Sequence, residues 1–280
     1  MAPLPACSFP NGLSVPAIGQ GTWGMGEDIR RRKAEVAALR QGLDLGLTLI
    51  DTAEMYAEGG AEEVTAEAIA GRRDEVVLVS KVLPHHADRA GTIAACENSL
   101  TRLKTDRIDI YLLHWRDHVA LEETLSGLIA LQEAGKIGGW GVSNFDPRDM
   151  AELLALPGAA DIQTNQVLYN LMRRGIEFDL LPAARAAHLP VMAYSPIEQG
   201  ALPRHPAVKA VAARHGVSPA VVALAWVISG GGVMAIPKAV SPEHVQDSRR
   251  ALELTLTAED FAALDRAFPA PTRAVPLEMI

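Results

Sequence analysis

Short apolar runs rich in β-branched residues alternate along the chain with longer runs in which alanine and leucine recur at helical spacing. Segments such as 32–46 and 121–136 are typical of helices that bury one face, and several of them end in glycine, a common helix stop. We predict strands in eight short runs: 17–23, 47–53, 75–82, 108–115, 138–145, 161–170, 189–197 and 232–240.

This alternation predicts an α/β fold, because eight strand–helix units in about 250 residues are the signature of a (β/α)8 TIM barrel. The main structural alternative is a doubly wound sheet, which carries G-x-G-x-x-G after its first strand. Here the first predicted strand ends in GQGTWGMG (19–26), with the glycines in a different order. Since no linker divides the sequence, residues 1–280 are expected to form a single barrel domain.

Both ends of the chain add elements to this barrel. The segment CSFPNGLSVPAIG (7–19) is interpreted as a β-hairpin that plugs one end of the barrel, because Asn11-Gly12 is a turn pair that accepts a positive φ at both central positions. After the eighth strand, 241–254 and 257–268 are predicted extra helices. The proline-rich tail 269–280 is predicted to be irregular.

Composition excludes some classes of function. With 49% hydrophobic and 21% charged residues, the chain has the balance of a globular protein. Its 26 Lys and Arg against 34 Asp and Glu give a net charge of −8, so we expect no nucleic-acid partner. The basic run Arg30–Lys33 is interpreted as a solvated helix face. No run reaches the roughly 20 apolar residues of a membrane span, so no membrane partner is expected.

Two cysteines, Cys7 and Cys96, stand far apart and outside any metal-like spacing. A disulfide between them is possible, but this usage fits a reducing compartment better. The start MAPLPACSFPNG lacks the basic residues and long apolar core of a secretory signal, so we expect a cytoplasmic protein. Composition does not reveal the oligomeric state, and we take a monomer or weak homo-oligomer as the expectation.

Polar residues stand at the ends of the predicted strands, where the site of a TIM barrel lies. Asp51, Lys81 and His114 end the second, third and fourth strands, and Tyr56 follows Asp51 by five positions. Taken alone, each has an ordinary interpretation, such as a turn former, a solvated charge, a core histidine or a rim aromatic. The other strand ends carry Ser143, Asn144, Asn165, Gln166, Tyr194, Ser195 and Lys238.

Together the first four residues suit carbonyl reduction. A lysine after an apolar strand needs a counter-charge, which Asp51 on the neighbouring strand supplies. A phenol has a pKa of roughly 10, and the ammonium of Lys81 is expected to lower that of Tyr56. Tyr56 would then deliver a proton to a carbonyl oxygen positioned by His114, while a nicotinamide provides the hydride. We therefore expect Tyr56 to lie within hydrogen-bonding distance of Lys81.

The segments LIDTAEMY, VSKV, LLHW, GVSNF, TNQVLYN, YSPI and IPKA occur in order along nearly the whole chain. They resemble the signature segments of the aldo/keto reductases. The resemblance implies a (β/α)8 barrel that binds NADP(H) in an extended form without a Rossmann motif. It also implies that Asp51, Tyr56, Lys81 and His114 form the catalytic tetrad.

The same resemblance implies the residues that contact the cofactor. Tyr194 matches the ring that stacks on the nicotinamide, and Ser143, Asn144 and Gln166 match the residues that hold its carboxamide. Gly21, Thr22 and Trp23 match the segment near the nicotinamide ribose and the substrate. The remaining implied cofactor contacts are Asp51, Ser195, Pro196, Ile197, Gln199, Ile236 and Pro237.

The segment IPKAVSPEHVQDS (236–248) matches the part of the family that grips the 2′-phosphate. Lys238 keeps a point charge for a phosphate. At the two other positions many family members have a serine and an arginine, where this chain has Ala239 and His244. Asp247 and Ser248 match positions near the adenine. We predict NADP(H) as the cofactor and NADH as a weaker alternative.

The loops after His114 and after the seventh strand are short, which predicts an open, shallow substrate pocket lined by Trp23, Tyr56, His114 and Trp115. Four segments, DTAEMYAEGGAEEV, ALAWVIS, GVMAIPKA and PLEMI, resemble the bacterial branch that includes methylglyoxal-reducing members. On that resemblance, small reactive aldehydes such as methylglyoxal are the expected substrates.

Two other classes of function stay open at this point. A non-catalytic barrel that binds NADP(H) as a regulatory subunit would show tight cofactor binding with negligible turnover. A metal-dependent or hydrolytic barrel would need paired carboxylates or a His/Asp cluster on its strand ends, where Asp51 is the only carboxylate. The pair His85-His86 lacks ordinary ligand spacing, so we expect no metal site.

Overall fold

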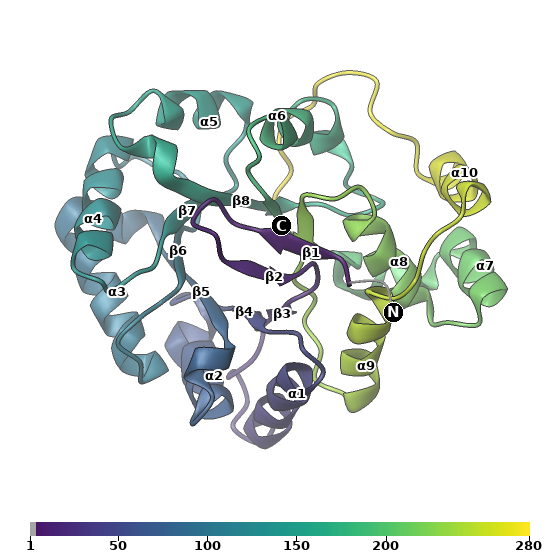
Figure 1. Ribbon diagram of the computed structural model, residues 1–280, viewed down its shortest axis with the longest axis horizontal. Coiled ribbons are helices and arrows are strands. Elements are labelled where there is room, and N and C mark those ends of the chain that lie inside the picture. Colours follow the sequence, from purple (N-terminus) through teal and green to yellow (C-terminus); the bar gives the residue numbers. More distant parts are fainter. Residues whose placement is uncertain (1–3) are drawn as a thin grey trace.

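The computed structural model describes residues 4–280. Eight parallel strands form one sheet in the order of the sequence, and this sheet curls into the predicted barrel (Figure 1). The strands are β3 (Gln20–Gly21), β4 (Leu49–Asp51), β5 (Val77–Val82), β6 (Ile110–Leu113), β7 (Trp140–Ser143), β8 (Ile162–Leu168), β9 (Val191–Tyr194) and β10 (Val233–Ala235).

Backbone hydrogen bonds between the first and last strands close the barrel. The N–H of Gly19 donates to the carbonyl of Ala235 at 2.8 Å, and the N–H of Ala235 donates to Ala17 at 2.8 Å. A third bond, from Gly21 to Pro237, has a length of 2.9 Å. These residues complete a ring that the strand assignments alone leave open.

Helices surround the strands, as the ring in Figure 1 shows. They are α1 (Arg32–Asp44), α2 (Gly60–Ile69), α3 (Arg89–Leu103), α4 (Leu121–Glu133), α5 (Pro147–Leu154), α6 (Leu180–Ala186), α7 (Pro206–His215), α8 (Pro219–Ile228), α9 (Pro242–Ala251) and α10 (Ala258–Ala267). Short 3-10 helices lie in the connections: η1 (Tyr56–Gly59), η2 (Arg73–Glu75), η3 (Pro84–His86), η4 (Ala159–Asp161), η5 (Gly175–Glu177), η6 (Glu198–Gly200) and η7 (Leu202–Arg204).

Local chemistry explains where several helices begin. The side chain of Asp88 accepts from the N–H of Gly91 at the start of α3. A reciprocal capping box of Asp146 and Asp149 starts α5. These side chains satisfy backbone donors that a helix leaves without partners in its first turn. The predicted strands and helices are found, most of the strands being shorter than predicted. Helix α9 completes the ring of helices, and α10 lies outside it (Figure 1).

A hairpin of β1 (Ala6–Ser8) and β2 (Ser14–Pro16) crosses the middle of the ring in Figure 1. The N–H of Asn11 donates to Oε1 of Gln163 near the start of β8, at 2.8 Å. Since Phe9 and Val15 are buried, the hairpin covers the amino ends of the strands as a plug. The carboxyl ends at the other side of the barrel stay free for a site.

The turn of this hairpin differs from the prediction. Only Gly12 has a positive φ, of 89°, so the expectation of positive φ at both Asn11 and Gly12 is wrong. Phe9 and Leu13 close the loop, with the N–H of Gly12 bonded to the carbonyl of Phe9 at 2.9 Å. Pro10 explains the difference, because its fixed φ favours an ordinary turn ahead of a glycine.

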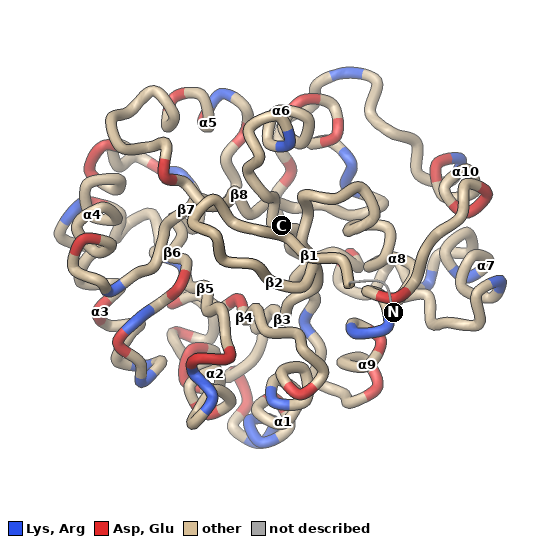
Figure 2. The backbone as a smooth tube through the Cα atoms, viewed as in Figure 1, with Lys and Arg blue, Asp and Glu red and all other residues tan. Residues whose placement is uncertain are grey.

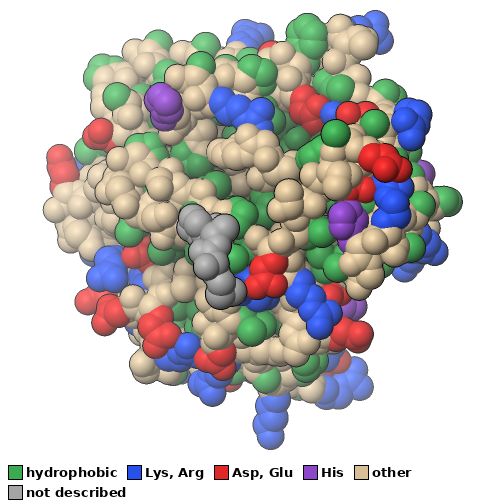
Figure 3. Space-filling view, turned by 45° about the vertical axis from the view of Figure 1, so that its right-hand side comes forward, with side chains coloured by type: hydrophobic (Ala, Val, Ile, Leu, Met, Phe, Trp, Pro, Cys, Tyr) green, Lys and Arg blue, Asp and Glu red, His purple; other side chains and the backbone are tan. Residues whose placement is uncertain are grey.

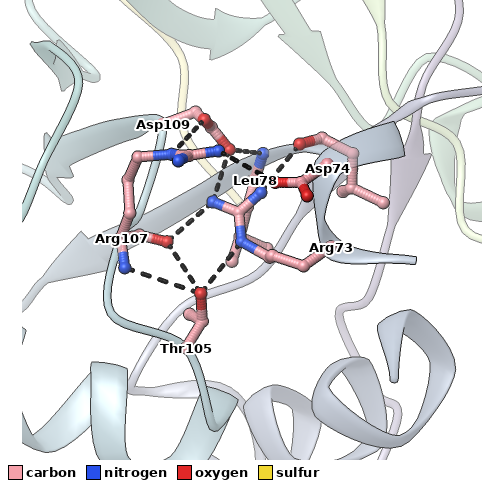
Figure 4. A network of polar contacts seen from close by, with 7 residues as sticks. Arg73, Asp74, Leu78, Thr105, Arg107 and Asp109 are labelled. Carbon is pink, nitrogen blue, oxygen red and sulfur yellow. Dashed lines mark hydrogen bonds and ion pairs between the residues drawn. The ribbon is translucent and has the colours of Figure 1, made fainter. Parts of the chain in front are cut away.

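A polar network fastens the amino ends of β5 and β6 (Figure 4). The guanidinium of Arg73 lies 2.7 Å from Oδ2 of Asp109, which also accepts from the N–H of Leu78 at 2.8 Å. Thr105 and Arg107 complete the network. This end of a TIM barrel serves stability, and the network ties η2 to two neighbouring strands.

Charged residues lie mainly on the outer helices (Figure 2), and positive and negative side chains are interspersed over the face in Figure 3. Within the basic run, Arg32 pairs with Glu63 at 3.1 Å and with Glu67 at 2.9 Å.

Cys7 and Cys96 are buried and free. Among residues 4–280, no single helix is long and apolar enough to cross a membrane, although the bent pair of α7 and α8 together reaches the required length and composition.

Candidate active site

The carboxyl ends of β4, β5 and β6 bring three polar side chains together. Asp51 is the last residue of β4, Lys81 lies near the end of β5, and His114 follows β6. In the parallel register Asp51 pairs with Val79 and Lys81 with Leu112, so the ends of adjacent strands meet at one rim. Lys81 is fully buried and Asp51 is 2% exposed.

Lys81 has a full set of hydrogen-bond acceptors. Its Nζ donates to Oδ2 of Asp51 at 2.9 Å, to the carbonyl of Thr52 at 2.8 Å and to the hydroxyl of Tyr56 at 3.2 Å. An ammonium group has three protons to donate, so none is left without a partner. The expected approach of Tyr56 to Lys81 is therefore found.

Burial sets the ionisation of the phenol. It raises the pKa of Tyr56 above its ordinary value, and the opposing charge of Lys81 does not cancel this rise. Burial also lowers the pKa of Lys81, but the carboxylate of Asp51 and the Tyr56 phenol more than offset it, so this pKa is raised. Lys81 does act to lower the pKa of Tyr56, as predicted, but burial raises this pKa by more, so its net value in the free protein lies above the usual one. Near neutral pH the phenol keeps its proton and the amine its charge.

His114 is an uncharged imidazole beside the phenol. Burial, together with the charge of Lys81, lowers its pKa to about 2. Its ring lies edge-on to Tyr56, with the two ring centres 5.8 Å apart. Its Nδ1 is buried, and no group among residues 4–280 forms a hydrogen bond with it. A neutral ring in this position can hydrogen-bond an uncharged carbonyl oxygen without carrying a charge of its own.

The polar side chains predicted to hold a carboxamide form a network with Asp51 at this rim. Nε2 of Gln166 donates to Oδ1 of Asp51 at 2.8 Å. Ser143 donates to the carbonyl of Gln166 at 2.9 Å, and Asn144 donates to Ser143 at 3.1 Å. The hydroxyl of Tyr194 donates to Oδ1 of Asn144 at 3.0 Å. Oδ1 of Asp51, which does not contact Lys81, is thus bonded by the same network that faces the predicted cofactor.

A cavity of about 640 Å³ opens at this rim. Its lining includes 17 of the predicted site residues: Gly21, Trp23, Asp51, Tyr56, His114, Trp115, Ser143, Asn144, Gln166, Tyr194, Ser195, Pro196, Ile197, Gln199, Ile236, Pro237 and Lys238. Of these, Lys238 is exposed.

Other predicted residues lie outside this cavity. Thr22 is buried and donates to the backbone carbonyl of Asp51 at 3.0 Å, so it fastens β3 to β4. Ala239 and Ser248 line a separate small cavity beside β3. His244 is exposed in the first turn of α9, and Asp247 is buried on the same helix. These positions stay predictions for the far end of the cofactor.

Four residues of the lining were not predicted: Met55, Gly200, Met279 and Ile280. The last two come from the irregular tail, which runs back from α10 to the barrel mouth (Figure 1). Local sequence carries no signal for this return beyond the apolar ending of the chain. Because the tail adds an apolar wall, the pocket is more enclosed than the loop lengths predict.

Arg173 connects the tail to the loop after β9. Arg173 lies 2.5 Å from Oε1 of Glu278 and 2.9 Å from Oε1 of Glu198, which begins η6 beside the cavity. Burial raises the pKa of Tyr194 to about 12, and the nearby backbone N–H of Ile280 opposes that rise. The end of the chain therefore lies against the ring predicted to stack on the nicotinamide.

The histidine pair after β5 has a structural explanation. The rings of His85 and His86 lie with centres 4.1 Å apart, and Nδ1 of His86 is 3.1 Å from Oε1 of Glu54. Glu54 also accepts from the N–H of Leu83 at 2.7 Å. In the part of the chain that the structure describes, no group of three or more His, Cys, Asp or Glu side chains is placed to hold a metal ion.

The residues present fit a nicotinamide cofactor. The cavity combines a phenol ring, Tyr194, with the amide groups of Asn144 and Gln166 and with exposed Lys238. The ring suits a flat heterocycle, the amides suit a carboxamide, and the lysine suits a phosphate.

Comparisons with known proteins agree with this geometry. The sequence profile of the aldo/keto reductase family matches residues 17–268. A methylglyoxal reductase of Escherichia coli, YeaE, is 53% identical over 277 residues, which cover 97% of this chain and 98% of the relative. The crystal structure of an aldo-keto reductase from Klebsiella pneumoniae in complex with NADPH is 51% identical, covers 100% of both chains and has a TM-score of 0.98. A thermostable aldo-keto reductase, Tm1743, solved with the inhibitor epalrestat, is 36% identical with a TM-score of 0.86, over 93% of this chain and 98% of that chain.

Proposed function

The chain belongs to the aldo/keto reductase family, and on that premise we propose that it reduces small reactive aldehydes, methylglyoxal among them, to alcohols with NADPH. The single observation that carries the proposal is the set of contacts at Lys81. This buried ammonium bonds both the carboxylate of Asp51 and the phenol of Tyr56, at a rim that opens onto the cavity.

In this proposal the phenol of Tyr56 is the proton donor. Bound NADPH supplies a hydride to the carbonyl carbon, and the carbonyl oxygen takes the proton of Tyr56. Lys81 stabilises the phenolate that forms, because its charge lies 3.2 Å from the oxygen that loses the proton. Asp51 keeps Lys81 charged and oriented.

His114 has the role of positioning the carbonyl oxygen. As a neutral ring it donates a hydrogen bond without competing with Tyr56 as an acid. Its low pKa supports this role, since the imidazole carries no charge at any physiological pH. The ring also lies beside the phenol, so one oxygen atom can meet both groups.

The cofactor is proposed to lie along the cavity from Gln166 to Lys238. Tyr194 would stack on the nicotinamide, and Ser143, Asn144 and Gln166 would hold its carboxamide. The two relatives of known structure from Klebsiella pneumoniae were crystallised with NADP or NADPH, which supports this choice of cofactor. Lys238 favours NADPH over NADH because it offers a charge to the 2′-phosphate.

The lining of the cavity supports small uncharged substrates. The wall near the phenol consists of Trp23, Met55, Trp115, Met279 and Ile280, which are apolar. Lys238 is the one basic residue in the lining that the structure describes, and it is proposed to serve the cofactor. A carboxylate on the substrate would therefore find no cationic partner, whereas methylglyoxal carries none. The name of the Escherichia coli relative agrees with this substrate.

A regulatory barrel that binds NADP(H) without turnover is the alternative. The intact set of Asp51, Tyr56, Lys81 and His114 argues against it, because such a protein has no need of a buried lysine next to a phenol. Measuring NADPH oxidation with methylglyoxal separates the two. Steady turnover supports the reductase, and tight NADPH binding without turnover would support the regulatory barrel.

We further infer that the protein acts in the cytoplasm and that one chain forms a complete site. The free, buried cysteines suit a reducing compartment. Asp51, Tyr56 and His114 line a cavity within a single chain, and Lys81 contacts two of them from below the lining, so we propose that activity does not require a partner subunit.

A further inference from the structure

The turn that follows Tyr56 has an unusual backbone. Ala57 has φ 50° and ψ 39°, Glu58 has φ 53° and ψ 40°, and Gly59 has φ 90°. Three successive residues thus adopt left-handed values, which L-residues other than glycine avoid because the Cβ approaches the carbonyl oxygen. Such a segment persists only where its surroundings hold it, and it directly follows the proposed proton donor.

Arg102 of α3 holds this turn from the outside of the barrel. A Cβ on Gly59 would lie 2.4 Å from Cδ and 2.6 Å from Nε of Arg102, so the guanidinium stem packs directly on the glycine. On another side of the turn, a Cβ on Gly26 would lie 2.5 Å from the carbonyl carbon of Gly60. The turn is therefore enclosed between Arg102 and the loop at Gly26.

Arg102 is in turn anchored to the strand that carries Lys81. Its Nε donates to Oε2 of Glu62 at 2.6 Å, and Oε1 of Glu62 accepts from the hydroxyl of Ser80 at 2.6 Å. Glu62 and Ser80 are fully buried. Ser80 precedes Lys81 on β5, and its side chain faces the helices while that of Lys81 faces the barrel mouth, because successive side chains of a strand alternate.

We infer that Ser80, Glu62 and Arg102 form an outer brace that sets the position of Tyr56 relative to Lys81. The three residues belong to β5, α2 and α3, and α2 packs against α3 around the barrel (Figure 1). One end of the brace is the neighbour of Lys81 and the other end packs on the turn of Tyr56. The brace is a set of positioning residues, since none of the three lines the cavity.

This inference rests on the proposed function, in which the distance between phenol and ammonium controls proton donation. Without the brace, the left-handed turn is free to relax, and the phenol oxygen leaves the 3.2 Å contact with Nζ of Lys81. Cofactor binding should persist, because the brace lies on the helix side of β5. The kcat, which depends on proton donation, and the pKa of Tyr56 should both change.

The test uses the full chain with Ser80→Ala and with the double variant Glu62→Gln/Arg102→Met, which removes both charges together and leaves no buried carboxylate unpaired. Arg89→Met serves as the matched control, because Arg89 is an exposed arginine at the start of the same helix. Circular dichroism and thermal unfolding confirm that each variant is folded.

Ionisation of Tyr56 is measured first, by ultraviolet difference titration of the free protein against the same protein carrying Tyr56→Phe. We expect the pKa of Tyr56 to move by half a unit or more in the double variant and to stay unchanged in Arg89→Met. This readout needs no turnover, so it tests the brace even where the proposed reaction fails. An unchanged titration of Tyr56 in folded brace variants would overturn the inference.

Turnover of methylglyoxal is measured second, together with the Kd of NADPH from fluorescence. We expect kcat to fall at least tenfold in the double variant, with the Kd of NADPH changed by less than twofold, and a smaller fall in Ser80→Ala. Equal losses in kcat and NADPH affinity would also contradict the brace, because they indicate general loosening of the barrel. Absence of turnover in the wild type would count against the proposed function alone.

Discussion

The Nζ of Lys81 lies 3.2 Å from the hydroxyl oxygen of Tyr56, although the two residues are 25 positions apart and belong to different strand–helix units. The same Nζ lies 2.9 Å from Asp51. A buried ammonium with a carboxylate on one side and a phenol on the other can stabilise the phenolate only while both contacts last. This arrangement leads to the first prediction.

Replacing Lys81 by methionine should lower kcat for methylglyoxal about 100-fold or more, because the phenolate of Tyr56 loses its stabilising charge. The change also leaves Asp51 buried without a cation, which costs about 3–5 kcal/mol of folding free energy. The Kd of NADPH should change little. Steady-state kinetics, fluorescence titration and chemical unfolding check the three parts.

The double variant Asp51→Asn/Lys81→Met is the control for this prediction. It should recover much of the lost stability, since both buried charges are removed, and it should remain as slow as the single variant. Recovery of turnover along with stability would show that Lys81 serves the fold and not the reaction.

The barrel and its rim were predictable from sequence because strand order and strand ends are local signals. Asp51, Lys81 and His114 each end an apolar run, and parallel strands put such ends at one rim. The pairing of Lys81 with Asp51 follows from the cost of burying a lone charge. Tyr56 was assigned from its spacing and from a family resemblance, since its loop could lead in several directions.

The features that escaped prediction depend on tertiary contacts. Met279 and Ile280 reach the cavity through an irregular tail, in which Leu277 packs against the core and Glu278 pairs with Arg173. The pKa of Tyr56 is set by the depth of its burial, which spacing does not reveal. The left-handed turn at Ala57 and Glu58 is held by side chains distant in sequence, so residue preferences give no hint of it.

The kcat for reduction should be independent of pH between about 6 and 9. Burial and the charge of Lys81 hold the pKa of His114 near 2, and burial raises that of Tyr56 above its usual value, so neither group titrates in this range. At higher pH kcat should fall as Tyr56 loses its proton. Measuring kcat against pH at saturating substrate checks this. A change in kcat near pH 6.5 that disappears in His114→Gln would contradict it.

The same histidine makes the fold sensitive to acid. Because unfolded His114 takes up a proton below a pKa of about 6.5 and folded His114 does not until about 2, stability should fall as pH drops through this window. The loss at pH 5 should be smaller in His114→Gln than in the wild type. Unfolding curves at pH 5 and pH 8 measure the difference.

Cofactor preference should depend on Lys238. Lys238→Ala should lower kcat/KM for NADPH about tenfold, the loss expected for one charge-assisted contact, and change that for NADH less than twofold. His244→Arg should raise the preference for NADPH, because it adds a permanent charge at the start of α9. Initial rates with both cofactors test this, and equal losses for NADPH and NADH would place Lys238 outside phosphate recognition.

Removal of Met279 and Ile280 should change which substrates are preferred. A chain that ends at Glu278 keeps the ion pair to Arg173 but loses the apolar wall beside Tyr194. We expect kcat/KM for methylglyoxal to fall by about tenfold, while that for a bulky aromatic aldehyde falls less or rises. A loss of the same factor for both aldehydes would mean that the tail only supports the fold.

The central claim is that Tyr56 gives the proton that completes reduction. Its most direct test is NADPH oxidation with methylglyoxal, comparing the wild type with Tyr56→Phe, which keeps the ring and removes only the hydroxyl that contacts Lys81. NADPH binding, followed by fluorescence, shows that the variant site is intact. The account predicts steady turnover in the wild type and a fall in kcat of at least 100-fold in Tyr56→Phe, with unchanged NADPH affinity. Undiminished turnover in Tyr56→Phe would contradict it.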